Sequence, residues 1–563
     1  MLPYSPRLAS LTILALACPA CVDDTAKDDA SATATSTATA STSIGAEESS
    51  SSEAVTTSGD GTTSETPTTG GPEPFVPGPV HGGLEIDWVE ANQGVGVAIG
   101  RDGAGVGGAE RTSYLLQNRL TLIRAFWKPL PDDWVPRAIE GRLTITYSDG
   151  TPELVLKSKP VMVNQESFIG SLDRSFYWGL MKEQVVPGIK YHIELFELEA
   201  GHEDYPAGAN PPRMPYTGNT FLGIEASDQV LKITLVPFNY DSGDGCKTTP
   251  DTSDATMKIF QDQMYMMNPV DKLDFTLHAP VDWNTKLSDF NELNEYMSGM
   301  RADEGAEPER YYYGIVDVCE GGLGGAGGKA YGIPQGGKVG DAWQRVSSGL
   351  SIDVDFSSET FVHEVGHSQG RFHVYCNGME GGPDYGYPTY PELDQTHGEI
   401  HDWGFGIVNF KLYHPTVHKD YMTYCHPVWA STWGWNKVYP IIKTLSTWDD
   451  AGAPKPDSLV GSVLVGSIYP DGKETWITVP GNVNAEDISA VHSVEFTIGG
   501  ETVYQPAAYL TQPEGDVVNV VTAVPERWDQ VTEMIRVAGP KRIAVPTAKI
   551  RQHHRPTAIK TAN

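Results

Sequence analysis

The strongest constraint in this sequence is an eleven-residue stretch, beginning at His363, that reads H-E-x-x-H-x-x-G-x-x-H. On an α-helix, His363 and His367 are one turn apart and share a face, so both imidazoles can reach one metal ion. Gly370 can adopt a positive φ, which would end the helix and bring His373 back as a third ligand. Three protein ligands leave a fourth position for water, the catalytic arrangement of zinc. The sequence therefore predicts one catalytic Zn²⁺ ion.

Glu364 directly follows the first ligand, where it can take a proton from a zinc-bound water. The alternative is a surface helix that is rich in histidine by chance. The segment 350–356 alternates apolar and polar residues, which predicts a strand with one exposed face. Ser357 to Thr360 then offers hydroxyl N-caps and an acid for the first helical turn. We expect the zinc helix to follow this strand and a short turn.

These residues resemble the metzincin zinc endopeptidases, whose second hallmark is a tight turn that places a methionine beneath the zinc. The segment Asp420–Cys425 reads D-Y-M-T-Y-C and fits that pattern. The resemblance implies that Met422 is an apolar floor under the ligands and that Tyr424 lies near the zinc, where it steadies an oxyanion. The alternatives are ordinary core packing for Met422 and a buried, hydrogen-bonded hydroxyl for Tyr424.

The resemblance further implies an α+β metzincin-like protease domain over 229–447, with a mixed sheet and the zinc helix. The sequence pattern predicts strands and helices that alternate before the motif: strands at 230–238, 274–278 and 311–318, and helices at 252–267 and 287–300. In metzincins an edge strand before the zinc helix pairs with extended substrate, and we place it in the glycine-rich segment 321–333. A mobile glycine loop is the alternative, and a phosphate loop is disfavoured because no Gly-Lys-Ser/Thr follows.

Two β-domains are expected to flank this region. Residues 83–228 alternate as an antiparallel, immunoglobulin-like β-sandwich would, with clear strands at 120–127, 141–147 and 191–197. Residues 448–563 carry strand patterns at 459–468, 475–479, 494–498 and 517–524. The predicted fold class is therefore multidomain, with the α+β protease domain between an N-terminal sandwich and a C-terminal β-domain.

The N-terminus reads as a targeting segment. Residues 1–17 combine Arg7 with a short apolar run, and Cys18 follows as the lipidated residue of a lipoprotein-like signal would. Ordinary secretory cleavage nearby is the alternative. Residues 18–82 are rich in Ser, Thr and acids and predict a disordered tether. We expect an extracellular or cell-surface protein that meets the membrane only through a lipid anchor.

Four cysteines remain beyond the processing region. An even number in an exported chain suggests disulfides, and four cysteines allow three pairings. We favour Cys376–Cys425, because one lies just past His373 and the other just past Met422, with Cys246–Cys319 as the second bridge. A cysteine–zinc site is the alternative, although no C-x-x-C pair occurs among the four.

A second polar cluster lies between the two motifs, at His397, Glu399, His401 and Asp402. It predicts solvated or structural side chains, with a second metal site as the alternative. Ca²⁺ is kept as a further metal candidate, to which no residue is assigned. The formal net charge of −33 argues against nucleic acid as a partner.

The predicted function is a zinc endopeptidase that hydrolyses extracellular proteins or glycoproteins, with Glu364 as general base. One rival is a surface binding protein or adhesin whose zinc domain is inactive. Another is a zinc amidase that acts on non-protein amides. The sequence leaves the substrate, the cleavage preference and the oligomeric state open.

Overall fold

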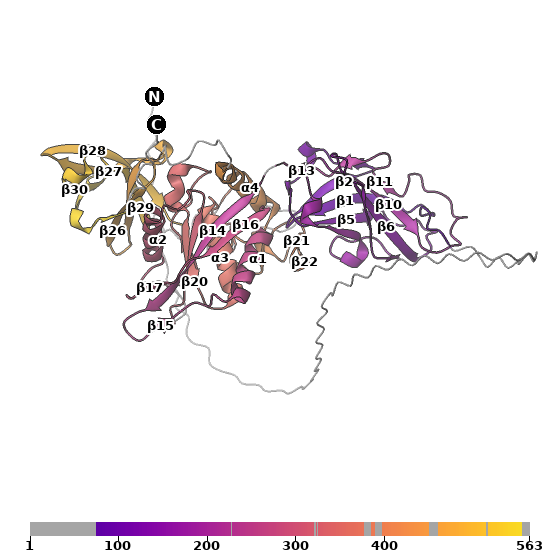
Figure 1. Cartoon of the computed structure of the whole chain (residues 1–563), viewed down its shortest axis with the longest axis horizontal. Coiled ribbons are helices and arrows are strands. Elements are labelled where there is room, and N and C mark those ends of the chain that lie inside the picture. Colours follow the sequence, from indigo (N-terminus) through magenta and orange to yellow (C-terminus); the bar gives the residue numbers. More distant parts are fainter. Residues whose placement is uncertain are drawn as a thin grey trace, which may run out of the picture. The chain divides into compact units, whose positions relative to one another are not determined.

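The computed structural model describes residues 75–553, except 227, 320–322, 324, 377–383, 389–396, 450–459 and 514–515 (Figure 1). The chain divides into two units, Met1–Glu73 and Pro74–Asn563. The predicted signal segment, Cys18 and most of the predicted tether therefore lie outside the described residues. Within the described part, no helix is long and apolar enough to cross a membrane.

Two antiparallel sheets form the first part of the described chain. One has the order β3-β2-β1-β5-β9, and the other is built on β11-β10-β6-β7 with β8 and β12 at its sides. Buried side chains from both sheets share one apolar core, which includes Ile123, Leu143 and Ile193. The main strands are β1 Ile86–Asn92, β2 Gly96–Arg101, β5 Thr121–Trp127, β6 Arg137–Thr146, β9 Phe176–Leu180 and β10 Lys190–Glu197. Three of these confirm the predicted strands.

A seven-stranded sheet follows, in the order β15-β14-β18-β20-β19, with β16 and β17 against the other side of β14. The neighbouring strands β16, β14, β18 and β20 run parallel to one another, and β19 is antiparallel to β20. The strands are β14 Val230–Asp241, β15 Lys247–Thr248, β16 Lys272–Leu277, β17 Val281–Trp283, β18 Tyr311–Val316, β19 Gly328–Ala330 and β20 Val346–Leu350. The long apolar run of β14 suits a parallel strand that is covered on both faces.

Four α-helices accompany this sheet: α1 Asp254–Met267, α2 Asn291–Asp303, α3 Val354–Ser368 and α4 Thr432–Ser446 (Figure 1). Ile233 and Leu235 of β14 share a core with α1, α3 and α4. Val236 and Phe238, further along the same strand, share another core with α2. Successive parts of β14 thus contribute to two cores.

The last sheet has eight strands in the order β31-β30-β27-β28-β29-β25-β26-β32. The four strands predicted here are confirmed as β25, β26, β27 and β29. The turn Gly499–Gly500 joins β27 to β28 with both residues at positive φ, as a two-residue hairpin turn requires. The strands are β25 Ser462–Ile468, β26 Glu474–Pro480, β27 Ile488–Ile498, β28 Glu501–Thr511, β29 Val518–Ala523, β30 Val531–Ala538, β31 Lys541–Val545 and β32 Arg551–Gln552.

The expected fold class, an α+β metzincin-like protease domain between two β-domains, is wrong. Among the described residues 38% lie in strands and 19% in helices, and the strands form several separate sheets. The expectation inferred the fold class of a whole domain from a short motif and one turn. Such a motif specifies one helix and its exit, whereas β-branched and aromatic residues along the rest of the chain favour sheets.

The predicted strand over 350–356 is also wrong beyond its first residue, because β20 ends at Leu350 and α3 begins at Val354. The Asp353 carboxylate accepts a hydrogen bond from the Phe356 N–H at 2.9 Å. It therefore caps the helix four residues earlier than the predicted hydroxyl caps. Ile352 is 61% exposed, so the alternation in this segment did not reflect a buried strand face.

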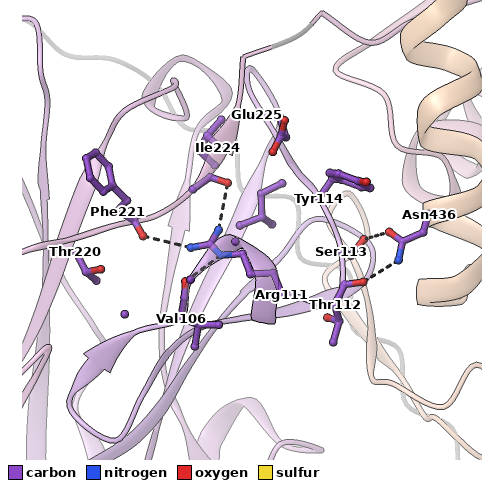
Figure 2. Close-up of a pocket in the computed structure, with 15 residues that line it drawn as sticks. Val106, Arg111, Thr112, Ser113, Tyr114, Thr220, Phe221, Ile224, Glu225 and Asn436 are labelled. Atoms are coloured by element: carbon purple, nitrogen blue, oxygen red, sulfur yellow. Dashed lines mark hydrogen bonds between the residues drawn. The ribbon is translucent and has the colours of Figure 1, made fainter.

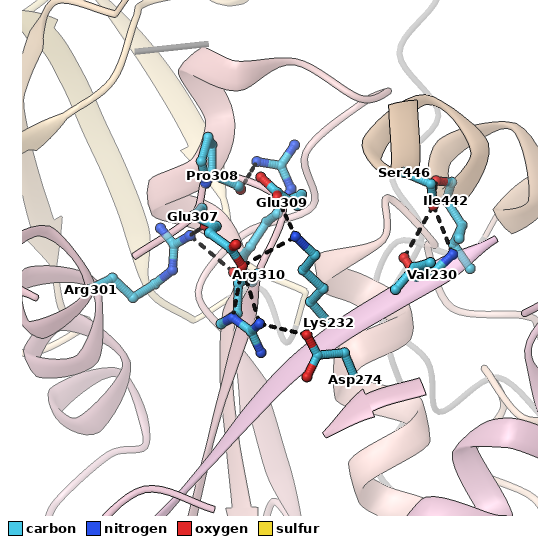
Figure 3. Close-up of polar contacts among 11 residues, drawn as sticks. Val230, Lys232, Asp274, Arg301, Glu307, Pro308, Glu309, Arg310, Ile442 and Ser446 are labelled. Atoms are coloured by element: carbon cyan, nitrogen blue, oxygen red, sulfur yellow. Dashed lines mark hydrogen bonds and ion pairs between the residues drawn. The ribbon is translucent and has the colours of Figure 1, made fainter. Parts of the chain in front are cut away.

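Figure 3 shows a polar network that joins three neighbouring strands where they begin. Lys232 of β14 contacts Glu309 at 2.8 Å, and Arg310, just before β18, contacts Asp274 of β16 at 2.8 Å. Lys232 and Glu309 are both buried, so each charge has lost its hydration and is compensated by the other. The network fixes β16, β14 and β18 relative to one another at the end from which each strand starts.

The turn between β1 and β2 packs into the core that carries α3. The Gly94 carbonyl accepts hydrogen bonds from Trp429 Nε1 at 2.9 Å and from the Phe405 N–H at 3.2 Å. Arg119 donates to the Gln93 carbonyl at 3.0 Å and to the Tyr265 carbonyl at 2.7 Å, at the end of α1. The first pair of sheets is therefore bound to the helices around the central sheet.

We expect Gly94→Ala to destabilise the protein. Gly94 has φ +139°, and a Cβ there would lie 2.7 Å from the Trp435 ring. Strain and overpacking together should cost about 2–4 kcal/mol, measured as a lower midpoint in urea denaturation. The matched control is Gly107→Ala, because no atom lies within 4 Å of that position and its φ is −71°. Equal midpoints for the two variants would contradict the packing described.

Candidate metal centre

The three predicted ligands come together. The Nε2 atom of His367 lies 3.2 Å from His363 Nε2 and 3.1 Å from His373 Nε2. All three side chains are buried, and their nitrogens fall within 4.8 Å of one another. Among the described residues this is the one group of three or more such side chains that is arranged to hold a metal ion.

Backbone carbonyls orient two of these rings. Nδ1 of His363 lies 2.7 Å from the Tyr421 carbonyl, and Nδ1 of His367 lies 2.7 Å from the Arg371 carbonyl. A carbonyl can only accept, so each Nδ1 carries the proton and each Nε2 keeps its lone pair. This is the tautomer that a metal ligand requires.

Two of the ligands, His363 and His367, are also held in the neutral form. Burial, together with the neighbouring His373, lowers the pKa of His363 to about 3. Burial likewise lowers the pKa of His367 well below its usual value, with His373 and His363 adding to the effect. A cluster that resists protonation suits a divalent cation, because metal binding does not first have to remove protons at neutral pH.

Gly370 makes the turn that the motif requires. Its φ is +85°, and a Cβ would lie 2.6 Å from the Pro334 carbonyl oxygen. The chain therefore leaves α3 through a left-handed residue and returns His373 to the other two ligands, as predicted.

Met422 lies directly against the ligand helix. It is fully buried, and a Cβ on Gly366 would lie 2.6 Å from its sulfur. Gly366 stands between the two ligands on α3, so the absence of its side chain lets Met422 approach the helix beside them. This placement agrees with an apolar floor under the imidazoles.

A buried ion pair, which the sequence reading missed, joins the ligand turn to the methionine turn. Arg371 donates to Asp420 at 2.9 Å, and both side chains are buried. Asp420 also accepts from the Met422 N–H at 2.9 Å and from the Ser431 hydroxyl. Because the Arg371 carbonyl holds His367, this one residue connects a metal ligand to the segment beneath it. The available signal was a pair of opposite charges on two segments predicted to converge.

Both predicted disulfides are formed. Cys376–Cys425 has a Cα–Cα distance of 6.2 Å and links the segment after His373 to the segment after Met422. Cys246–Cys319 has a Cα–Cα distance of 6.0 Å and joins the residue before β15 to the segment that follows β18. Two disulfides are typical of proteins that fold outside a reducing compartment.

Glu364 is buried beside the centre, between α3 and the edge strand β19. A Cβ on Gly328 would lie 2.7 Å from Glu364 Cγ, so this strand can approach the carboxylate only because position 328 is glycine. Burial raises the pKa of the nearby Tyr313 well above its usual value, and the Glu364 charge raises it further. The predicted edge strand thus forms, at residues 328–330 within the segment we expected.

Tyr424 lies next to the imidazoles and remains 39% exposed. Its ring centroid is 4.6 Å from that of His373 and 5.8 Å from that of His363. The buried-tyrosine alternative is therefore not what the structure shows. Tyr424 therefore presents a partly exposed phenol beside the ligand rings.

The second polar cluster does not assemble as a metal site in the described part of the chain. Glu399 pairs with Lys419 at 2.6 Å, His401 lies 3.3 Å from the Pro388 carbonyl, and Asp402 accepts from Thr432 at 2.8 Å. These contacts agree with the structural role predicted for the cluster. No group of three or more carboxylates arranged for a metal ion is found among the described residues either.

A separate cavity of about 590 Å³ lies beside Arg111 and contains none of the predicted site residues (Figure 2). The Arg111 guanidinium donates to the carbonyls of Val106, Phe221, Leu222 and Gly223. Asn436 of α4 is bonded to Ser113 and to the Thr112 carbonyl. Asn436 thus joins α4 to the first sheets at this cavity, whereas Arg111 binds backbone carbonyls within those sheets. We assign the cavity no reaction.

Comparison with known proteins gives little for this chain. No protein-family model and no curated protein matches it. One solved structure, described as "putative beta-galactosidase from bacteroides fragilis", covers 84% of this chain and 74% of its own, at 9% identity and a TM-score of 0.12. So low a score supports no argument about fold or function, and the centre has to be judged on its own geometry.

We expect Asp420→Asn to weaken metal binding about 10–100-fold, as changes to groups that orient metal ligands typically do. The substitution keeps the shape of the side chain but leaves the buried Arg371 without a countercharge. Competition with a fluorescent zinc chelator would measure the affinity. Asp402→Asn is the control, because the Asp402 carboxylate, like that of Asp420, accepts a hydrogen bond from a hydroxyl at the start of α4. The same affinity in both variants would contradict the role of the Arg371–Asp420 pair.

Proposed function

We propose that this chain is a zinc-dependent peptidase. The observation that carries the proposal is the convergence of three buried imidazoles, with Glu364 buried directly after the first of them on the same helix. Nitrogen donors without competing carboxylates or thiolates suit zinc among the common divalent metals. We propose kinship with the metzincins for this site and its methionine turn alone.

Zinc bound by His363, His367 and His373 would supply Lewis-acid activation of water and of a substrate carbonyl. Glu364 would accept the proton of the attacking water and pass it to the leaving amine. The Tyr424 hydroxyl would donate a hydrogen bond to the developing oxyanion.

The edge strand supports an extended peptide as the substrate. Gly327 and Tyr331 hydrogen-bond to β20, through Leu350 N–H to Gly327 O and Tyr331 N–H to Val346 O. Alternation along an antiparallel pair then turns the backbone groups of Gly328 and Ala330 away from β20. A peptide that adds here as a further strand would run beside Glu364, although Gly328 and Ala330 are buried in the free chain.

Export and anchoring are proposed together with this activity. The disulfides support a location outside the reducing cytoplasm. The signal-like segment and Cys18 would supply the route and a lipid anchor. Extracellular proteins or glycoproteins are the substrates within reach of such an enzyme.

Glu364→Gln should keep zinc but lower the rate of peptide cleavage by about 10²–10⁴-fold, because the amide cannot accept the proton. Cleavage of a peptide library, followed by mass spectrometry, measures the rate, and metal analysis confirms the loading. The matched control is Glu359→Gln on the same helix, where Glu359 pairs with His426 at 2.9 Å. Full activity in zinc-loaded Glu364→Gln would refute the mechanism.

Cell-wall fragments, tested in parallel with and without chelator, separate the peptidase from an amidase. Cleavage of those fragments but of no peptide would refute the peptidase and support the amidase.

A further inference from the structure

The edge strand β19 is short and pairs with β20 alone among the described strands. Three ladder residues give it few backbone hydrogen bonds, so its position depends on side-chain contacts. Gly328 faces α3 and Glu364. Because side chains alternate along a strand, Lys329 points to the opposite face.

Lys329 is anchored there between two carboxylates. Its Nζ lies 3.0 Å from Asp289, just before α2, and 2.8 Å from Asp516, in the connection between β28 and β29. The lysine is 2% exposed, so its ammonium group has exchanged water for these two partners. A buried cation of this kind holds its strand firmly, because any shift would leave the charge poorly compensated.

The neighbouring backbone is held by the same two elements. Asn294 of α2 donates to the Lys329 carbonyl at 2.8 Å, and Asn519 of β29 donates to the Tyr331 carbonyl at 2.9 Å. Tyr331 and Val346 share an apolar core with Val463 and Val521 of the last sheet. The C-terminal sheet therefore contacts the strand that borders Glu364, although it contributes no residue to the metal centre.

We propose that Lys329 is a positioning residue and that the C-terminal sheet, through Asp516 and Asn519, holds β19 in register for an extended peptide. The inference rests on the proposed peptidase function and assigns a role to a sheet that carries no catalytic group. We call the contacts of Lys329 with Asp289 and Asp516 the clamp. Loosening the clamp should weaken the binding of peptides that span the edge strand. It should not alter zinc affinity or the chemistry at Glu364.

The test compares Lys329→Met and the milder Asp516→Asn with the wild-type, zinc-loaded full chain. The matched control is Lys338→Met, because Lys338 also forms an ion pair with the C-terminal segment, through Glu486, but lies outside β19. Measurements are kcat and KM on a long and a very short peptide, zinc affinity, and amide hydrogen exchange over residues 326–331.

We expect KM for the long peptide to rise about tenfold in Lys329→Met and less in Asp516→Asn. Zinc affinity and kcat should stay within about twofold, and exchange should accelerate only in β19. Unchanged KM and exchange in both variants, with an active wild type, would overturn the clamp. If Lys329→Met does not fold, Asp516→Asn decides by the same criteria. A zinc-loaded wild type that cleaves no peptide would refute the peptidase, while exchange would still report whether the clamp exists.

Discussion

The arrangement depends on one interaction above the others, the buried pair between Arg371 and Asp420. The pair joins two segments that are far apart along the chain but must meet for the metal centre to exist. The Arg371 carbonyl orients His367, and Asp420 holds the Met422 N–H. A charge pair of this kind tolerates little displacement once it is out of water. Gly370 and the Cys376–Cys425 disulfide add covalent and conformational limits to the same junction.

The sheets on both sides support the centre without supplying ligands. The turn around Gly94 is wedged between Trp429 and Trp435, which share the core of α3 and Met422. The last sheet shares its core with β18, β20 and α2. Each flanking sheet thus stabilises one side of the central sheet. The residues that could do chemistry are concentrated in α3, its exit and the methionine turn.

The sequence predicted the centre better than it predicted the fold. The spacing of the three histidines, the turn at Gly370 and the Cys376–Cys425 disulfide follow from local geometry and from convergence on one ion, which a motif can encode. The Cys246–Cys319 disulfide was predicted only as the remaining pair. The fold class was wrong because a short motif carries no information about strand content elsewhere. The start of α3 was missed because Asp353 caps it before the hydroxyl residues that also fit the pattern.

Other features could not be found from one sequence. The partners of Lys329 are separated from it by 40 and 187 positions, and no local pattern connects them. Gly328 lies in the glycine-rich segment and Gly366 in the histidine motif. The reason for each glycine is visible only in the structure, where Glu364 packs against Gly328 and Met422 packs against Gly366. Contacts of this kind depend on the tertiary arrangement of the chain rather than on spacing.

The most direct test of the account is X-ray absorption at the zinc edge on the purified, zinc-loaded protein. The account predicts one zinc per chain, with three imidazole nitrogens at about 2.0–2.1 Å and one further oxygen ligand. A sulfur shell, a site saturated by four protein ligands, or no bound zinc at neutral pH would contradict it.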